Sequence, residues 1–205
     1  MNTQTFLVEI GTEELPPKAL EKLSDAFAVE LVKGLQKANL SHSQVSRFAT
    51  PRRLAVRIEQ LALLQANQES ERRGPALQAA FDKEGNPSKA LEGFARSCNV
   101  AVSDLTKLET DKGAWLVYRS HQPGLATAAL IPSIVEAALA ALPIPKRMRW
   151  GSLSTEFVRP VHWVVLLLGS EVVAADIMGI RADRVTRGHR FHATAPISLA
   201  HPDEY

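Results

Sequence analysis

Adjacent carboxylates and a pair of histidines are the first groups in this 205-residue sequence that could do chemistry. Glu13 and Glu14 are neighbours whose side chains diverge, and both precede an expected helix, where negative charge suits the helix dipole. His189 and His192 are the closest histidines. In an extended segment their odd separation sends them to opposite faces, which is poor geometry for chelating one metal ion. We therefore expect Glu13 and Glu14 to mark a helix entrance, and we expect no metal site.

Motifs for nucleotide, dinucleotide and acyl chemistry are missing from the sequence. It contains no Gly-x-x-x-x-Gly-Lys-Ser/Thr loop, no Gly-x-Gly-x-x-Gly turn and no Gly-x-Ser-x-Gly elbow. The only cysteine, Cys98, cannot form an intramolecular disulfide, and we interpret it as a small core residue. A small hydrolase built on Glu13, His162, Asp176 and His189 is the enzyme alternative, but no nucleophile or metal spacing supports it. We expect no catalytic residue in this chain.

Positive charge is concentrated late in the sequence. Residues 143–192 hold eight Lys or Arg and four Asp or Glu, a net charge of 8 − 4 = +4, so the rest of the +2 chain carries −2. Such an imbalance is typical of surfaces that contact phosphates, although arginines that solvate strand faces or pair with Glu13, Glu14 and Asp183 would explain it as well. The candidate residues for binding RNA or a protein partner are Arg52, Arg53, Lys146, Arg147, Arg149, Arg184, Arg187, His189 and Arg190.

Composition and hydropathy limit the class of protein. The chain is 45% hydrophobic and 22% charged, which is typical of a globular protein large enough to bury a sizeable core. Its apolar runs are far shorter than the roughly 20 residues of a membrane-spanning helix. The amino terminus lacks the basic and apolar regions of a signal peptide. We therefore expect a cytoplasmic protein that makes no contact with a membrane.

The first elements that must position these residues are a strand and a long helix. Phe6, Val8 and Ile10 alternate with other residue types, which predicts a strand. Pro16–Pro17 then opens a helix that ends near 38–39, because leucines and a phenylalanine recur every three or four residues as one apolar stripe. The residues of this stripe are Leu20, Leu23, Phe27, Leu31 and Leu35.

The middle of the chain alternates between strands and short helices. We expect a strand over 54–58 with one solvent-exposed face, which the polar residues 65–75 then break. Two short helices follow between 76 and 96, separated at 84–87, with Ser88 capping the second. Residues 115–118 predict a strand. Residues 132–142 predict a helix with Pro132 in its first turn and Pro143 at its end.

Apolar, β-branched segments dominate the last third. We expect strands at 157–158, 161–168, 172–178 and 185–191, with a hairpin turn at Gly169–Ser170 and Trp163 in the core. The pattern predicts an α+β protein with a mostly antiparallel or mixed sheet and strands concentrated in the last third. Two lobes would fit it, a helix-rich one over 1–142 and a strand-rich one over 143–205.

Several sequence elements together resemble the amino-terminal region of the bacterial glycyl-tRNA synthetase beta subunit. They occur in the same order from residue 6 to about 191, which makes them more specific than a single short motif. The elements are FLVEIGTEELPP (6–17), TPRRL (50–54), RRGP (72–75), LPIPKRMRWG (142–151), FVRPVH (157–162) and RGHRF (187–191).

The resemblance implies a class II synthetase of two alpha and two beta subunits. In that family the alpha subunit carries the site for glycine and for ATP with magnesium, and the beta subunit is implicated in handling tRNA(Gly). Beta there continues into a region resembling an HD domain and an anticodon-binding domain, so this chain would be an amino-terminal piece without ligation activity of its own. The alternative is a free-standing RNA-binding module that uses the two basic segments, and the extent of the intact gene would distinguish the two.

Overall fold

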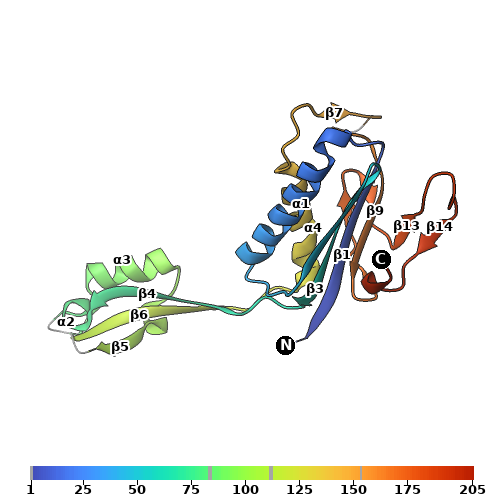
Figure 1. Cartoon of the computed structure of the whole chain (residues 1–205). Helices are drawn as coiled ribbons and strands as arrows, with labels where there is room; N and C mark the ends of the chain where they lie inside the picture. The colour runs from blue at the N-terminus through green and yellow to red at the C-terminus, as the bar shows by residue number, and fades with distance from the viewer. Residues whose placement is uncertain (1, 83–84, 111–112, 153) are drawn as a thin grey trace. The chain divides into compact units, whose positions relative to one another are not determined.

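A computed structural model describes residues 2–82, 85–110, 113–152 and 154–205, and the chain divides into two compact units (Figure 1). Unit 1 comprises residues 1–66 and 125–205, and unit 2 comprises residues 67–124. These boundaries differ from the expected lobes 1–142 and 143–205. The physical reason is that strand β9 (Val161–Leu168) pairs with strand β1 (Thr3–Thr12), so the two ends of the sequence share one sheet.

Unit 1 is built on a five-stranded antiparallel sheet in the order β10-β9-β1-β3-β2. Strand β1 lies in its centre, where Phe6 pairs with Ile58 on one side and with Leu168 on the other. The predicted strands at 6–10, 54–58 and 161–168 are confirmed. The remaining strands of this sheet are β2 (Val45–Thr50), β3 (Arg53–Ala62) and β10 (Glu171–Val172).

Helices α1 (Pro17–Lys37) and α4 (Thr127–Ala140) cover one face of this sheet (Figure 1). The predicted apolar stripe of α1 is confirmed, because Leu23, Phe27, Leu31 and Leu35 are buried in the main core. The helix leaves through Asn39, whose φ of 52° is in the left-handed region that Asn tolerates. Alternate residues of β1, β3 and β9 complete this core from the sheet side.

Helix α4 begins five residues earlier than the sequence predicted. Thr127 anchors its first turn to strand β3: the Thr127 hydroxyl donates to the carbonyl of Ala62 at 2.5 Å, and its backbone N–H donates to that of Leu63 at 2.9 Å. Pro132 therefore lies in the second turn rather than the first. Because proline has no N–H, one bond of the helical ladder is missing there.

The C-terminal part of unit 1 covers the opposite face of the sheet (Figure 1). The hairpin of β13 (Val185–Arg187) and β14 (Pro196–Ser198) and the short helix η2 (Pro202–Glu204) lie on this side. A second, smaller apolar cluster forms beneath them, which includes Trp163 as predicted. Its buried members are Leu7, Trp163, Val165, Leu167 and Leu199.

Short hairpins complete unit 1. The predicted turn at Gly169–Ser170 is confirmed, because Leu168 pairs with Glu171 and Gly169 has a φ of 59°. Two further antiparallel pairs are β7 (Met148–Arg149) with β8 (Glu156–Phe157), and β11 (Asp176–Ile177) with β12 (Ile180–Arg181). The predicted strand 172–178 is thus divided between β10 and β11, and the predicted strand 185–191 ends at 187.

The described residues of unit 2 form a three-stranded antiparallel sheet, in the order β4-β6-β5, together with two α-helices and a single 3-10 turn. Its strands are β4 (Gln68–Ala76), β5 (Thr106–Thr110) and β6 (Gly113–Gln122), and its helices are α2 (Leu77–Ala80), α3 (Lys89–Cys98) and the single turn η1 (Val102–Asp104). The predicted cap is confirmed, since the Ser88 hydroxyl accepts from the N–H of Leu91 at 3.3 Å. Residue 84, in the expected break, lies outside the described residues.

Two expectations for this part of the chain need correction. The polar segment 65–75 was expected to break the strand that precedes it, and β3 does end at Ala62, but most of the segment itself forms the edge strand β4, where polar side chains are tolerated in solvent. Cys98 ends helix α3 and is partly exposed, so it is not a core residue.

The two segments that lead into and out of unit 2 lie next to each other in unit 1. The backbone N–H of Gln65 donates to the carbonyl of Leu125 at 2.9 Å, and Leu64 forms an antiparallel bridge with Ala126. Unit 2 is therefore an insertion between two neighbouring points of the unit 1 chain.

The predicted α+β class and antiparallel sheet are confirmed, but strands are spread through the chain and not concentrated in its last third. The long strands β1, β3 and β6 all precede residue 123. None of the described helices has the length and apolar character needed to cross a membrane.

Candidate binding cleft

A cleft of about 590 Å³ opens on the sheet face opposite the two long helices. It is lined by four parts of unit 1: Glu14 in the segment between β1 and α1, the turn between β2 and β3, the start of β9, and the segment from the end of β13 onward. Residues with basic or aromatic side chains dominate the lining. They are Arg52, Arg53, His162, Trp163, Arg187, His189, Arg190 and Phe191.

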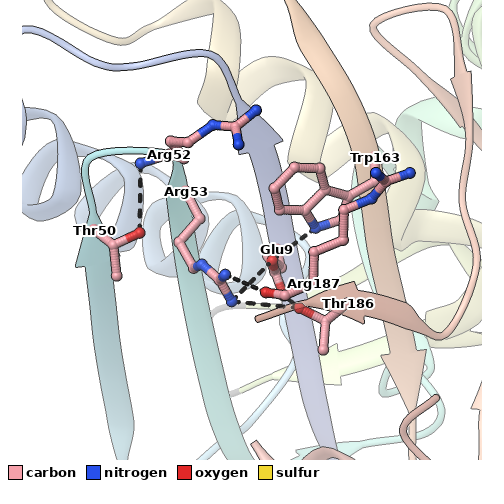
Figure 2. A network of polar contacts seen from close by, with 7 residues as sticks. All are labelled: Glu9, Thr50, Arg52, Arg53, Trp163, Thr186 and Arg187. Carbon is pink, nitrogen blue, oxygen red and sulfur yellow. Dashed lines mark hydrogen bonds and ion pairs between the residues drawn. The ribbon is translucent and has the colours of Figure 1, made fainter. Parts of the chain in front are cut away.

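A buried carboxylate lies behind the cleft, in contact with Trp163 and Arg53 of its lining. Glu9 points to the face of β1 opposite Phe6, Val8 and Ile10. It is 0% exposed, because the C-terminal part of unit 1 covers that face. It accepts a hydrogen bond from Trp163 Nε1 at 2.7 Å and another from the Thr186 hydroxyl at 2.6 Å (Figure 2). Burying a charged group is costly unless it is paired and hydrogen-bonded, and these bonds offset part of that cost.

Arg53 supplies the positive partner of Glu9. Its Nη1 lies 3.4 Å from Glu9 Oε1 and 3.4 Å from the Thr186 hydroxyl oxygen. Its Nη2 donates to the backbone carbonyl of Arg187 (Figure 2). Only 17% of the Arg53 side chain is exposed, so screening by solvent is limited. The network therefore ties β13 to the central strands of the sheet.

The indole of Trp163 depends on the absence of a side chain at Gly11. The two residues pair across β1 and β9, and a Cβ atom on Gly11 would come within 2.0 Å of the Trp163 ring. The guanidinium groups of Arg53 and Arg187 lie 5.9 and 5.5 Å from the Trp163 ring centroid, within the range of cation–π attraction. Trp163 is therefore both a core residue and a wall of the cleft.

Tyr205 approaches the same network from helix η2. Burial raises the pKa of Tyr205 to about 12, and the negative charge of Glu9 adds to this effect, whereas Arg53 opposes it. Phe48 packs edge-on against the Tyr205 ring, with the centroids 5.3 Å apart. The Tyr205 phenol is thus held in its neutral form at physiological pH.

Glu13 is engaged with two basic side chains of the cleft lining. Its Oε1 is 3.4 Å from Arg52 Nη2 and 3.0 Å from His162 Nε2. Helix α1 begins at Pro17 and has no acidic residue in its first turn. Glu13 and Glu14 thus precede the helix, as expected, but the Glu13 carboxylate is engaged in charge pairing with Arg52 and His162.

The loop after β13 departs from the predicted extended conformation. The backbone N–H groups of His192 and Ala193 both donate to the carbonyl of His189, at 3.2 and 2.9 Å, which curls the chain into a turn. As a result, the rings of His189 and His192 stack with centroids 4.6 Å apart and do not point to opposite faces. Arg187 and Arg190 also line the same cleft, although the odd separation between them would send them to opposite faces of an extended segment.

The arginines of the cleft differ in how far their charge is compensated. Arg52 and Arg53 are paired with Glu13 and Glu9. Arg187 and Arg190 have no carboxylate within ion-pair distance among the described residues, and both side chains are exposed. The rim of the cleft therefore carries two positive charges that a bound anion could neutralise.

The other basic candidates lie outside the cleft lining, and three of them have internal partners. Arg147 donates to the carbonyl of Ala140 at 2.7 Å, and Arg149 pairs with Glu156 at 3.0 Å across β7 and β8. Arg184 donates to the carbonyls of Leu199 and Ser170, at 3.3 and 2.9 Å. Lys146 is exposed in the loop after α4. The structure therefore brings together Arg52, Arg53, Arg187, His189 and Arg190, but not these four.

The residues of the hydrolase alternative do not form a catalytic group. Glu13 contacts His162, but Asp176 pairs with Arg181 at 3.2 Å in the separate β11–β12 hairpin. In the described parts of the chain, no cluster of three or more His, Cys, Asp or Glu side chains is placed to hold a metal ion. The residue pattern did not point to Glu9 and Thr186. The one signal in the sequence was a lone carboxylate within the apolar run 6–10.

Comparison with known proteins adds independent evidence. Over residues 6–205, the sequence matches the family described as glycyl-tRNA synthetase beta subunit. Proteins named glycine–tRNA ligase beta subunit are 59% identical to it in Hahella chejuensis, 56% in Marinobacter nauticus and 54% in Klebsiella pneumoniae. Each comparison covers all 205 residues of this chain, which spans 30% of the length of each relative.

Proposed function

Because this chain belongs to the glycyl-tRNA synthetase beta subunit family, we propose that it helps a glycine–tRNA ligase to bind tRNA(Gly). The observation that carries this proposal is the pair of uncompensated arginines, Arg187 and Arg190, at the rim of the cleft. Arginine binds phosphate oxygens through two parallel hydrogen bonds, and it does so most strongly where no carboxylate competes.

The ligation chemistry is assigned to another subunit in this proposal. The complete enzyme would be a class II synthetase of two alpha and two beta subunits in the cytoplasm, with glycine, ATP and magnesium bound by alpha. The described residues of this chain offer no acidic or histidine cluster for magnesium, so they are given no part in the chemistry of ATP. The remaining surface of the chain, including the strip Lys146–Arg149, is proposed to contribute to assembly with alpha.

Pyrophosphate exchange tests where the chemistry takes place. The purified chain should show no glycine-dependent exchange of pyrophosphate into ATP, because adenylate formation needs the alpha subunit. Addition of alpha to the complete beta subunit provides the positive control. Glycine-dependent exchange by this chain alone, free of alpha, would overturn the assignment.

Salt-dependent tRNA binding tests the cleft. The association constant K falls as salt rises, so the slope of log K against log salt is negative. Removing one phosphate-binding side chain should reduce the magnitude of this slope by about 0.7–0.9, so the double variant Arg187→Gln with Arg190→Gln should reduce it by roughly 1.4–1.8. Arg181→Gln is the matched control, because Arg181 is exposed and paired with Asp176 in another hairpin. Fluorescence anisotropy with labelled tRNA measures both slopes.

The strip at 146–149 offers a contrasting variant. Replacing Lys146, Arg147 and Arg149 by alanine would lower the slope by roughly 2–3 if all three touched phosphate. Since Arg147 and Arg149 bind Ala140 and Glu156 internally, we expect the triple variant to change the slope less than the cleft double variant does. Equal and negligible changes for every variant would refute the tRNA role and favour the alpha interface as the reason for the charge.

A further inference from the structure

We propose that the cleft takes one unpaired nucleotide of the RNA, with its phosphate at Arg187 and Arg190 and its base against the ring of Phe191. This inference rests on the proposed function and names the part of the RNA that the site would accept. Phe191 is 78% exposed, although its ring is fully apolar. The Arg190 guanidinium lies 5.7 Å from its centroid, so an anion bound by Arg190 would bring an adjoining planar group close to the Phe191 ring.

The size of the cleft favours a small group. Its volume of about 590 Å³ lies within the roughly 300–1,000 Å³ typical of small-ligand sites. Bases within a duplex have their faces covered by their neighbours, and only an unstacked base presents a face to an aromatic side chain. A double helix could therefore touch the arginines at the rim but could not place a base in the cleft.

The chemistry of the lining matches that of sites for single-stranded nucleic acid. Such sites combine a positively charged groove with flat side chains on which bases stack. Here Phe191 and His189 supply planar surfaces in the lining, with His192 stacked on His189 outside it, and Arg187 and Arg190 supply the charge. The centroids of the Phe191 and His189 rings are 6.1 Å apart, so the flat surfaces and the charges belong to one loop.

The polar network holds this loop in place before any ligand binds. Arg53 donates to the carbonyl of Arg187, and Glu9 accepts from Thr186, which fixes the strand immediately before the loop. Within the loop, Gly188 packs so closely on Ala193 that an added Cβ would lie 2.5 Å from the alanine methyl group. A preorganised loop loses less conformational entropy on binding, and this improves affinity.

The test compares two RNA probes with the full 205-residue chain. One is a fluorescein-labelled single-stranded decauridylate, and the other is a blunt-ended duplex of ten base pairs. At equal low salt, the single strand should bind more tightly to the wild-type chain. Phe191→Ala should weaken single-strand binding by about 5- to 140-fold, the loss expected for one base–aromatic stack, and should leave duplex binding unchanged.

The salt slope separates stacking from phosphate binding. Phe191→Ala should lower affinity without changing the slope, because every phosphate-binding side chain remains. Arg187→Gln should lower the single-strand slope by about 0.7. Phe191→Trp should retain tight binding because it keeps an aromatic face. Leu64→Ala is the control for loss of an exposed apolar side chain, since Leu64 is 60% exposed and lies outside the cleft.

The outcomes distinguish this inference from the proposed function. Equal binding of the two probes, together with no effect of Phe191→Ala, would overturn the nucleotide site. The tRNA role would survive that result if the arginine variants still weakened tRNA binding. No binding of tRNA or of either probe at low salt would overturn both. Urea unfolding of each variant establishes that the fold is retained, and the retention of Phe191→Trp binding guards against a folding artefact.

Discussion

Replacing Glu9 by Gln tests whether the buried charge pair stabilises unit 1. The substitution keeps the shape of the side chain but removes its charge. Trp163 Nε1 can only donate, so the remaining carbonyl oxygen must stay with it in the place of Oε1, which also faces Arg53, and the new amide group then takes the place of Oε2 and faces Thr186. Arg53 would lose its negatively charged partner, and water could compensate little, because only 17% of the Arg53 side chain is exposed.

The expected loss is large because Glu9 is completely buried. Removing one partner of a buried ion pair typically costs about 3–5 kcal/mol. Arg53 keeps its bonds to Thr186 and to the carbonyl of Arg187, which places the expected loss of unfolding free energy near the lower end, at about 3 kcal/mol. The Thr186 hydroxyl can rotate to accept from the amide, which limits the loss further.

Urea unfolding followed by far-UV circular dichroism and indole fluorescence measures this loss. Glu156→Gln is the matched control in the same unit, because its pair with Arg149 is exposed on both sides. That substitution should change the free energy of unfolding by no more than about 1 kcal/mol. If Glu9→Gln destabilised the chain no more than Glu156→Gln does, the network would not be what holds β13 on the sheet.

Three further perturbations have defined outcomes. Phe27→Ala should lower the free energy of unfolding by about 3–5 kcal/mol, because Phe27 is 0% exposed, and a loss below about 1 kcal/mol in urea would contradict its core position. Gly11→Ala should lower the free energy of unfolding by at least about 1–3 kcal/mol, because the new methyl group overpacks Trp163. Gly93→Ala, on an open face of α3, should instead raise it by roughly 0.5–1 kcal/mol. Calorimetry measures both variants, and a Gly93→Ala chain less stable than the Gly11→Ala chain would contradict the reasoning. The pKa of the Tyr205 phenol is about 12 in the folded chain and near 10 in the unfolded chain, so above pH 10 the unfolded chain loses the phenol proton more readily. The stability that the neutral phenol contributes is therefore complete below pH 10 and is lost as pH rises through 12. Urea unfolding between pH 9 and 11 should therefore show a weaker loss of stability for Tyr205→Phe than for the parent chain, and identical pH dependences would contradict the assignment.

Elements with a strong apolar period could be predicted from the sequence. Helix α1 followed from the three- and four-residue spacing of Leu23, Phe27 and Leu31, and β1 and β9 followed from their alternating or continuous apolar runs. The edge strand β4 could not be predicted in this way. Its polar residues carry no periodic signal, and it is a strand because β6 offers backbone partners.

The cleft could be predicted only in part. The arginine-rich segments drew attention to Arg52, Arg53, Arg187 and Arg190, but charge alone did not separate them from Lys146–Arg149. What distinguishes the cleft arginines from that strip is a set of tertiary contacts. The β2–β3 turn and the segment after β13 are more than 130 residues apart in sequence and meet through the bond from Arg53 to the carbonyl of Arg187. The turn at His189 likewise depends on local backbone bonds that residue spacing does not encode.

The neighbouring ends of unit 2 make that unit removable in principle. Gln65 and Leu125 are already joined by a backbone hydrogen bond, so a connection of a few glycines between them would close a loop that unit 1 tolerates. A shortened chain of this kind would keep every residue of the cleft, which lies wholly within unit 1. The 58-residue insertion could thus be lost, enlarged or exchanged during evolution without redesign of the sheet that carries the arginines.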